Sequence, residues 1–63
     1  MLNSVEIAKT AIEDFREIQR YMVIAKEEGA TKTYSELKKK YISLKALLSV
    51  IGVNLTDIDE IKE

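Results

Sequence analysis

The chain has 63 residues, no cysteine, no histidine and a formal net charge of −1. Its length permits one domain, residues 1–63, and the missing residue types exclude disulfides, thiolate nucleophiles, zinc sites of the usual nitrogen and sulfur type and a histidine general base. At this length a folded chain buries only about 60% of its unfolded surface, so we expect oligomerisation to supply part of the core.

The composition is that of a soluble protein. Apolar residues make up 46% and charged residues 33% of the chain. The longest apolar run, residues 21–25, is far shorter than the roughly 20 residues that span a membrane. Residues 1–15 contain acidic groups and no long apolar stretch, which argues against a signal peptide. We therefore expect a cytoplasmic protein with no membrane association.

The first predicted helix runs from about Ser4 to Glu28. Its apolar residues recur at alternate steps of three and four, which places them in one stripe on a helix. This stripe comprises Ala8, Ala11, Phe15, Ile18, Met22 and Ala25. Asn3 is the expected N-cap, and Gly29 is expected to end the helix because glycine enters the left-handed conformation without a steric cost.

The second predicted helix begins at the sequence TYSE and ends at Gly52. Thr33 and Glu36 have the spacing of a capping box, in which each side chain accepts the other residue's backbone N–H. The apolar stripe that follows is Tyr34, Leu37, Tyr41, Leu44, Leu48 and Ile51. Val53, just beyond the glycine, is expected to fold back on the last turn in a Schellman-type arrangement.

A short third helix is predicted in the remaining residues, with Asn54 or Thr56 as its N-cap. Acidic residues fall in its first turn, where the helix dipole favours negative charge. A helix of about six or seven residues is marginal in isolation, so packing must hold it in place.

The predicted fold class is all-α: an antiparallel helical hairpin with a short third helix, assembled as a dimeric helical bundle. The short link after Gly29 makes the first two helices antiparallel. This pair alone leaves Ile42, Leu47 and Val50 facing water, and a second chain packing across them covers these side chains. In the competing arrangement the third helix covers them within one chain. The predicted oligomer core is Phe15, Ile18, Met22, Leu44, Leu47, Leu48 and Ile51.

The segment SLKALLSVIGVNLTDIDEIKE, centred on Gly52, resembles the helix-turn-helix of repressor-type DNA-binding proteins. Besides the turn glycine, the matching positions are Leu47, Ile51, Val53, Ile58 and Ile61. The resemblance implies a DNA-binding regulator as the alternative function. Leu48 stands where that motif takes a small residue, and Lys62 is the only basic group of an acidic recognition helix. Because phosphate contacts dominate affinity for DNA, we expect no nucleic-acid partner.

The run YSELKKKY resembles the small sporulation phosphatases that act on response regulators. Their signature is a Ser-x-Glu-Leu-Asp run whose aspartate is linked to activity. Lys38 stands in the place of that aspartate. The resemblance therefore implies, as a third interpretation, a degenerate relative without the phosphatase activity.

Charge is distributed unevenly along the chain. Residues 32–45 contain five lysines against Glu36, whereas residues 57–63 contain four acidic groups against Lys62. We expect a protein partner to contact one of these two regions. The candidate contact residues are Lys38, Lys39 and Lys40 in the basic region, and Asp57, Asp59 and Glu60 in the acidic one.

The second half of the chain also resembles small uncharacterised helical proteins of phages and prophages of Gram-positive bacteria, which implies a mobile-element origin. The carboxylate pairs of the sequence fall at helix surfaces and ends, where nothing predicts the perturbed pKa that acid–base catalysis requires. No catalytic residue, cofactor or metal site is expected. The sequence thus predicts a non-enzymatic interaction or regulatory protein that forms a homodimer and binds an unidentified protein partner.

Overall fold

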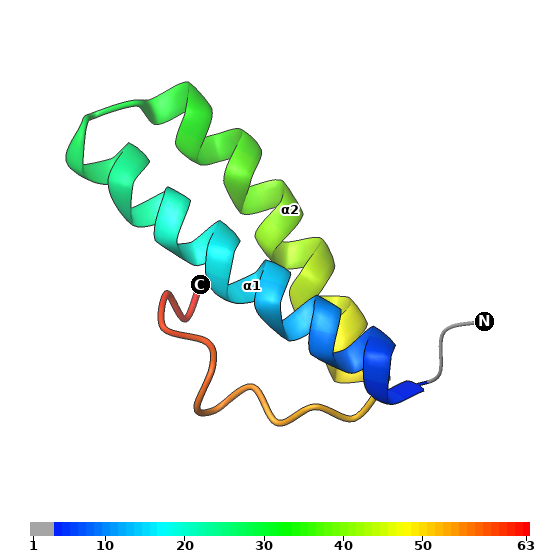
Figure 1. The fold of residues 1–63 in the computed structure, drawn as a ribbon. Helices are drawn as coiled ribbons and strands as arrows, with labels where there is room; N and C mark the ends of the chain where they lie inside the picture. Colours follow the sequence, from blue (N-terminus) through cyan, green and yellow to red (C-terminus); the bar gives the residue numbers. More distant parts are fainter. Residues whose placement is uncertain (1–3) are drawn as a thin grey trace.

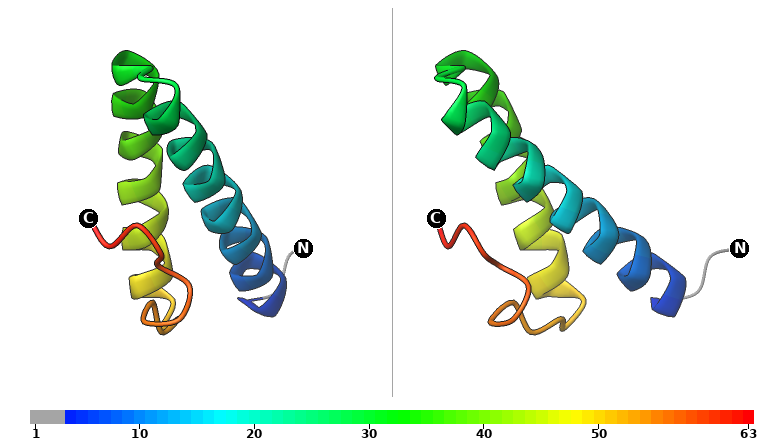
Figure 2. Two further views of the ribbon diagram at one scale, coloured as in Figure 1. Left: turned by 90° about the vertical axis from the view of Figure 1, so that its left-hand side faces the viewer. Right: turned by 60° about the vertical axis from the view of Figure 1, so that its left-hand side comes forward.

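The protein is a helical hairpin closed by an irregular segment, and a computed structural model describes residues 4–63 of it. Helix α1 spans Ser4–Glu27 and helix α2 spans Thr31–Val50 (Figure 1). The two helices pack antiparallel and diverge from their connecting turn toward the opposite end (Figure 2). The described residues contain no strand, which confirms the all-α prediction.

Helix α1 buries most of the apolar stripe that its sequence predicts, and Ala8 is half-buried. Ala11, Phe15, Ile18, Met22 and Ala25 are all buried. The predicted N-cap, Asn3, lies outside the described residues.

A glycine turn joins the helices, as predicted, but the second helix begins earlier than expected. Gly29 has a φ of +70°, and Ala30 N–H donates to the Ala25 carbonyl at 2.9 Å, which completes a Schellman motif. Because this motif reverses the chain at once, α2 starts at Thr31. Ala30 takes the N-cap position without a side-chain cap. The predicted capping box is therefore wrong, since Thr33 already lies inside the helix.

The centre of the helix–helix contact is aromatic. The rings of Phe15 on α1 and Tyr41 on α2 stack with centroids 5.3 Å apart and planes 12° apart. Tyr41 and Leu48 are the buried residues of α2. Stacked aromatic pairs contribute about 0.5–1.5 kcal/mol beyond the apolar area they bury, so this pair holds the two helices in register.

Helix α2 ends as its sequence predicts. Gly52 has a φ of +84°. Val53 N–H donates to the Leu48 carbonyl at 2.9 Å and Gly52 N–H donates to the Ser49 carbonyl at 3.2 Å, the two hydrogen bonds of a Schellman motif. Residues 53–63, called the C-terminal segment below, then run back along the hairpin (Figures 1 and 2).

The predicted third helix is wrong, because the C-terminal segment contains a turn, a bend and irregular stretches but no helix. One turn does form, in which Asp59 N–H donates to the Leu55 carbonyl at 2.9 Å. It is not continued, because the N–H groups of Glu60 and Ile61 donate to the side-chain oxygen of Gln19 on α1 instead. A tertiary acceptor therefore replaces the helical one.

Replacement of Gly52 should test this corner. A Cβ there would meet no atom within 4 Å, so a substitution is opposed by backbone strain alone. We expect Gly52→Val to lower the free energy of unfolding by about 1–2 kcal/mol or more, and Gly52→Asn to lower it less, because asparagine tolerates the left-handed region. Urea unfolding followed by circular dichroism measures both, and equal midpoints for parent and variants would place the strain elsewhere.

Candidate functional site

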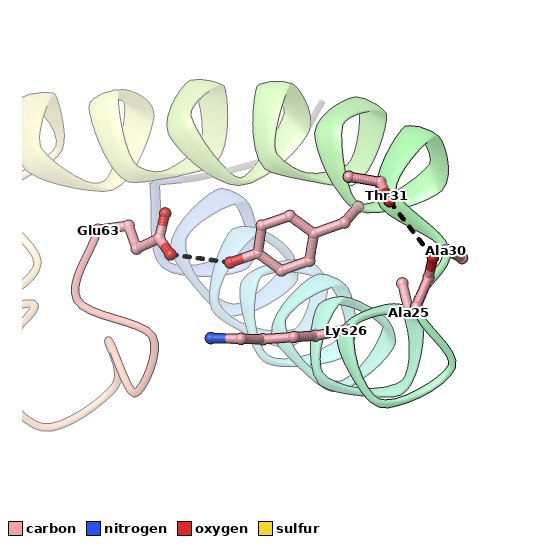
Figure 3. Close-up of a pocket in the computed structure, with 7 residues that line it drawn as sticks. Ala25, Lys26, Ala30, Thr31 and Glu63 are labelled. Atoms are coloured by element: carbon pink, nitrogen blue, oxygen red, sulfur yellow. Dashed lines mark hydrogen bonds between the residues drawn. The ribbon is translucent and has the colours of Figure 1, made fainter.

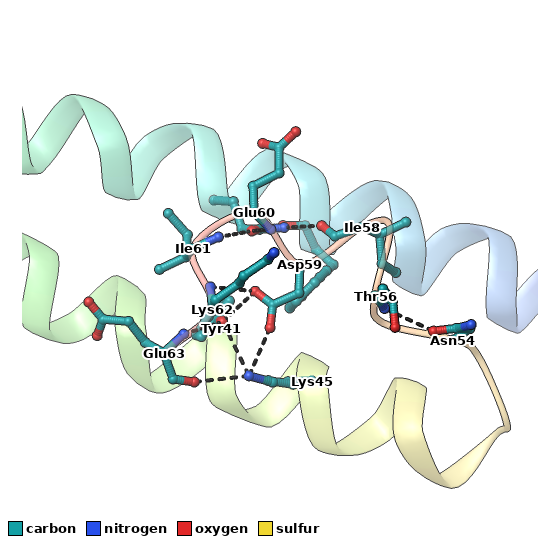
Figure 4. A network of polar contacts seen from close by, with 12 residues as sticks. Tyr41, Lys45, Asn54, Thr56, Ile58, Asp59, Glu60, Ile61, Lys62 and Glu63 are labelled. Atoms are coloured by element: carbon teal, nitrogen blue, oxygen red, sulfur yellow. Dashed lines mark hydrogen bonds and ion pairs between the residues drawn. The ribbon is translucent and has the colours of Figure 1, made fainter.

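The C-terminal segment packs on one side of the hairpin through apolar side chains. Four of its residues lie against the buried core: Val53, Leu55, Ile58 and Ile61. The polar groups between them are held by side chains of both helices (Figure 4). The helix residues that make these polar contacts are Gln19, Tyr34, Lys38, Tyr41 and Lys45, which together are called the docking surface below.

Gln19 binds the backbone of the segment. This side chain is only 1% exposed. Its Nε2 donates to the Ile58 carbonyl at 2.8 Å, and its Oε1 accepts the N–H groups of Glu60 at 2.6 Å and Ile61 at 2.9 Å. One amide thus satisfies three backbone groups that have no helical partner. Gln19 was not predicted from the sequence, although a polar residue one turn after Phe15 beside the buried stripe was a usable signal.

Asp59 binds through its carboxylate at the middle of the docking surface. It is 7% exposed. Its Oδ1 accepts the Tyr41 hydroxyl at 2.6 Å and the Lys62 N–H at 2.8 Å, and its Oδ2 pairs with Lys45 Nζ at 2.8 Å. The Tyr41 oxygen also accepts Glu63 N–H at 3.1 Å. Every buried side-chain nitrogen and oxygen of residues 4–63 has a hydrogen-bond partner.

The contacts of Asp59 keep it ionised. Burial raises the pKa of its carboxyl, but the hydrogen bonds from Lys45, Tyr41 and the Lys62 N–H outweigh burial and bring the pKa below its ordinary value of 3.8. The hydrogen bond to Asp59 in turn raises the pKa of Lys45 above 10.5. The two groups therefore form a stable ion pair at neutral pH.

Glu63 makes a second acidic contact near the connecting turn. The residue before it, Lys62, is in the left-handed conformation with a φ of +58°. Glu63 Oε2 pairs with Lys38 Nζ at 2.6 Å, Oε1 accepts the Tyr34 hydroxyl at 2.9 Å, and the backbone oxygen accepts Lys45 Nζ at 2.9 Å. The hydrogen bond from Lys38 is the main reason that the pKa of Glu63 is lowered from 4.5.

A pocket of 210 Å³ lies beside this second contact (Figure 3). Its walls come from the end of α1, the start of α2 and Glu63. Lys26 and Tyr34 are its long polar side chains, and the Tyr34 hydroxyl is already bound to Glu63. Within residues 4–63 no group of three or more acidic side chains is placed to hold a metal ion.

The structure separates the predicted partner-contact residues. Lys38 pairs with Glu63, and Lys39 pairs with Glu36 at 3.1 Å. Asp59 is buried within its own chain, so it is not part of the exposed surface. The other three, Lys40, Asp57 and Glu60, are exposed.

The predicted oligomer core also divides into two groups. Phe15, Ile18, Met22 and Leu48 are buried within one chain. Leu44 is half-buried, whereas Leu47 and Ile51 are 41% and 38% exposed. Ile42 and Val50 are exposed as well, because the C-terminal segment does not cover them.

The structure bears on the two motif resemblances in different ways. The helix-turn-helix resemblance requires a second helix after Gly52, and residues 53–63 form none. Lys38, which stands in place of the phosphatase aspartate, is an ion-pair partner of Glu63.

No protein-family model, curated protein or solved structure matches the chain. Neither helix in the described part of the chain is both long enough and apolar enough to cross a membrane. The site is therefore interpreted from its own geometry.

Tyr41→Phe should isolate the hydroxyl contacts of Tyr41 from its ring contacts. The variant keeps the ring on Phe15 but removes the donor to Asp59 and the acceptor for Glu63 N–H. We expect a loss of about 1.5–3 kcal/mol in the free energy of unfolding, the range for a hydrogen bond to a charged group. Tyr34→Phe is the matched control, because its hydroxyl contact is exposed and water replaces it. Equal effects of the two substitutions in urea unfolding would contradict this assignment.

Stability should depend on pH in the direction set by Asp59 and Lys45. Because the folded pKa of Asp59 lies below 3.8, its stabilising contribution is present above that pH and is lost as the pH falls through the lower folded value. Because the folded pKa of Lys45 lies above 10.5, its contribution is present below that pH and is lost as the pH rises through the higher value. Urea midpoints measured across pH should form a plateau with a decline at each end, and Asp59→Asn should flatten the acid decline. An unchanged acid decline in that variant would assign it to other carboxylates.

Proposed function

We propose that this chain is a non-enzymatic protein-interaction or regulatory protein that forms a homodimer. The observation that supports the dimer is an open apolar depression between the two helices, with a volume of 190 Å³. Its lining residues, called the open face below, are Ile7, Thr10, Ala11, Asp14, Leu44 and Leu47. None of them belongs to the C-terminal segment.

The open face and the docking surface lie on different sides of the hairpin. On α1, Asp14 and Gln19 are five positions apart, which places their side chains about 140° apart around the helix. On α2, Leu47 and Lys45 are two positions apart, which separates their side chains by about 160° measured the shorter way around the helix. The segment that covers Gln19 and Lys45 therefore leaves the opposite side of the helix pair unoccupied.

The residue spacing on this side suits helix packing. Ile7, Ala11 and Asp14 follow one another at steps of four and three on α1, and Leu44 and Leu47 continue to Ile51 in the same way on α2. Such ridges are the surfaces through which helices of a bundle interdigitate. The depression between them is the place where a helix of another chain can insert apolar side chains.

A second copy suits the charges in and beside the open face. Asp14 lies on the α1 ridge, and Lys40 precedes Leu44 by one turn on the α2 ridge. A two-fold interface brings each ridge against the same surface of a partner, so one acid and one base on each copy can pair across it. A chain of this length also gains from a shared core, because its own core is small.

The non-enzymatic assignment rests on the use of the titratable groups. The carboxylates and lysines with shifted pKa values, Asp59, Glu63, Lys38 and Lys45, bind one another between the C-terminal segment and α2. The shifts stabilise their ordinary charged forms, whereas an acid–base catalyst needs a pKa moved toward the operating pH. A phage or prophage context is part of this proposal and rests on the sequence resemblance of the second half.

Leu47→Lys should test the dimer. The parent is expected to have about twice the 7.2 kDa chain mass in light scattering on a sizing column at micromolar concentration. Leu47 is half-exposed in the single chain, so a lysine can extend into water without disturbing the fold, but in the dimer its charge is buried without a partner. We expect the variant to run as a monomer with unchanged helicity.

Val50→Lys is the matched control. The sequence placed Val50 in the dimer contact with Ile42 and Leu47, but in the structure it is 84% exposed, does not line the depression and lies about 60° farther around α2 from Leu44 than Leu47 does. This variant should keep the parent mass. A monomeric parent, or equal loss of mass in both variants, would contradict the proposed interface.

A further inference from the structure

The C-terminal segment is bound to the hairpin as a ligand is bound to a receptor. It has no helix or strand of its own, and its local backbone hydrogen bonds are limited to the turn at Leu55. The contacts that position its second half come from α1 and α2. In Figure 4 the side chains of Tyr41 and Lys45 converge on Asp59, while the Glu60 side chain points away from Asp59.

The contacts define which features of the segment are recognised. Gln19 binds backbone groups, and so its hydrogen bonds are available to a peptide of any sequence. Tyr41 and Lys45 select a carboxylate at the position of Asp59, and apolar side chains at Ile58 and Ile61 pack on the core. Lys38 and Tyr34 then bind a second acidic group at Glu63. The recognised pattern is apolar–Asp–x–apolar–x–acid in an irregular backbone.

The segment is joined to the hairpin by a single corner. In the Schellman motif at Gly52, the carbonyls of Leu48 and Ser49 accept the N–H groups of Val53 and Gly52. The helix end is therefore closed without help from residues 54–63. The stacked pair of Phe15 and Tyr41 joins the helices independently of the segment. The two helices therefore have contacts of their own that do not pass through residues 54–63.

We infer that the docking surface is a peptide-binding site for an acidic segment of a partner protein that has the pattern apolar–Asp–x–apolar–x–acid and an irregular backbone, and that residues 53–63 occupy this site in the free protein. This inference deepens the proposed interaction function and rests on it. Charge complementarity selects the partner, since Lys38 and Lys45 lie in the basic region of the chain and both bind acidic groups here. The proposed dimer uses the other side of the hairpin, so a foreign segment can bind without dissociating it.

The tethered segment makes this site autoinhibited. A covalently attached ligand acts at an effective concentration of the order of millimolar, so a free peptide binds the parent only in the fraction of molecules whose own segment is released. Any change that weakens the attached segment without altering α1 or α2 should strengthen the binding of the free peptide. This dependence distinguishes a binding site from a purely structural contact.

The probe is a fluorescently labelled synthetic peptide of residues 53–63, titrated with full-length protein and followed by anisotropy. Asp59→Asn in the protein weakens its own segment and leaves the docking surface intact. We expect this variant to bind the probe at least about tenfold more tightly than the parent does, because the competent fraction rises. A second protein carries an insertion of about ten glycine and serine residues after Gly52, which lowers the effective concentration while keeping every contact residue. It should also bind the probe more tightly than the parent.

Two controls define the specificity. Gln19→Leu added to Asp59→Asn should abolish the gain, because the backbone contacts are lost, and a probe carrying Asp59→Asn should bind all proteins weakly. A probe that keeps the four apolar residues Val53, Leu55, Ile58 and Ile61 and the acids Asp59 and Glu63, but has serine elsewhere, should bind within a few-fold of the original. Circular dichroism checks that each protein is helical. If the Asp59→Asn protein is not helical, the insertion variant provides the test.

The outcomes are distinct. Equal, weak binding of the probe by the parent and both opened proteins would overturn the inference, and so would tight binding that survives Gln19→Leu. A rise of the insertion variant's mass above that of the parent, reversed by the probe, would show that the occupant is the segment of a second copy and would overturn the partner assignment. Light scattering on the same samples reports the dimer separately, so failure of the proposed dimer is not confused with failure of the peptide site.

Discussion

The contact between Tyr41 and Asp59 connects the two parts of this molecule. The Tyr41 ring stacks on Phe15 within the apolar contact of α1 and α2, and its hydroxyl donates to the buried carboxylate at 2.6 Å. Lys45 completes the arrangement from the next turn, both as the ion-pair partner of Asp59 and with Nζ 5.5 Å from the centre of the Tyr41 ring. The side chain that holds the helices in register therefore also sets the position of the C-terminal segment.

The ion pair joins a buried carboxylate, Asp59, to a partly exposed lysine, Lys45. Removing a carboxylate from water is costly, and its attraction to a lysine offsets that cost only when further hydrogen bonds satisfy the remaining polar atoms. Asp59 meets this condition through the Tyr41 hydroxyl and the Lys62 N–H. These contacts together place the Asp59 carboxylate, and with it the segment, at one position on α2.

The hairpin consequently has two unlike sides. The docking surface is polar and is occupied by residues of the same chain, whereas the open face has apolar ridges and Leu47 at its edge is 41% exposed. An apolar side suits a permanent partner that supplies missing core, and a polar side with backbone-directed hydrogen bonds suits an exchangeable one. This division is the basis for proposing a second copy on one side and a partner's peptide on the other.

Local sequence was sufficient for the two helices and for their C-terminal ends. The three-and-four spacing around Phe15 predicts the buried stripe of α1, and Gly29 and Gly52 both adopt the left-handed φ that their positions required. These features depend on periodicity and on the steric freedom of glycine, which act over a few residues. The capping box at Thr33 was wrong because the turn geometry at Gly29, rather than the side chains that follow, determines where α2 begins.

The conformation of residues 53–63 depends on tertiary contacts. Asn54, Thr56 and the acidic residues after them carry the local signals of a helix start, and one turn does form at Leu55. The next N–H groups then find the Gln19 amide, which is about 40 positions away in sequence, as separations of 41 and 42 show. The same long-range packing buries Asp59 against Tyr41 and Lys45 and leaves Leu47 exposed. Such contacts cannot be predicted from residue spacing along the sequence. Whether a backbone N–H bonds to a carbonyl of its own helix depends on which acceptor the folded chain places beside it.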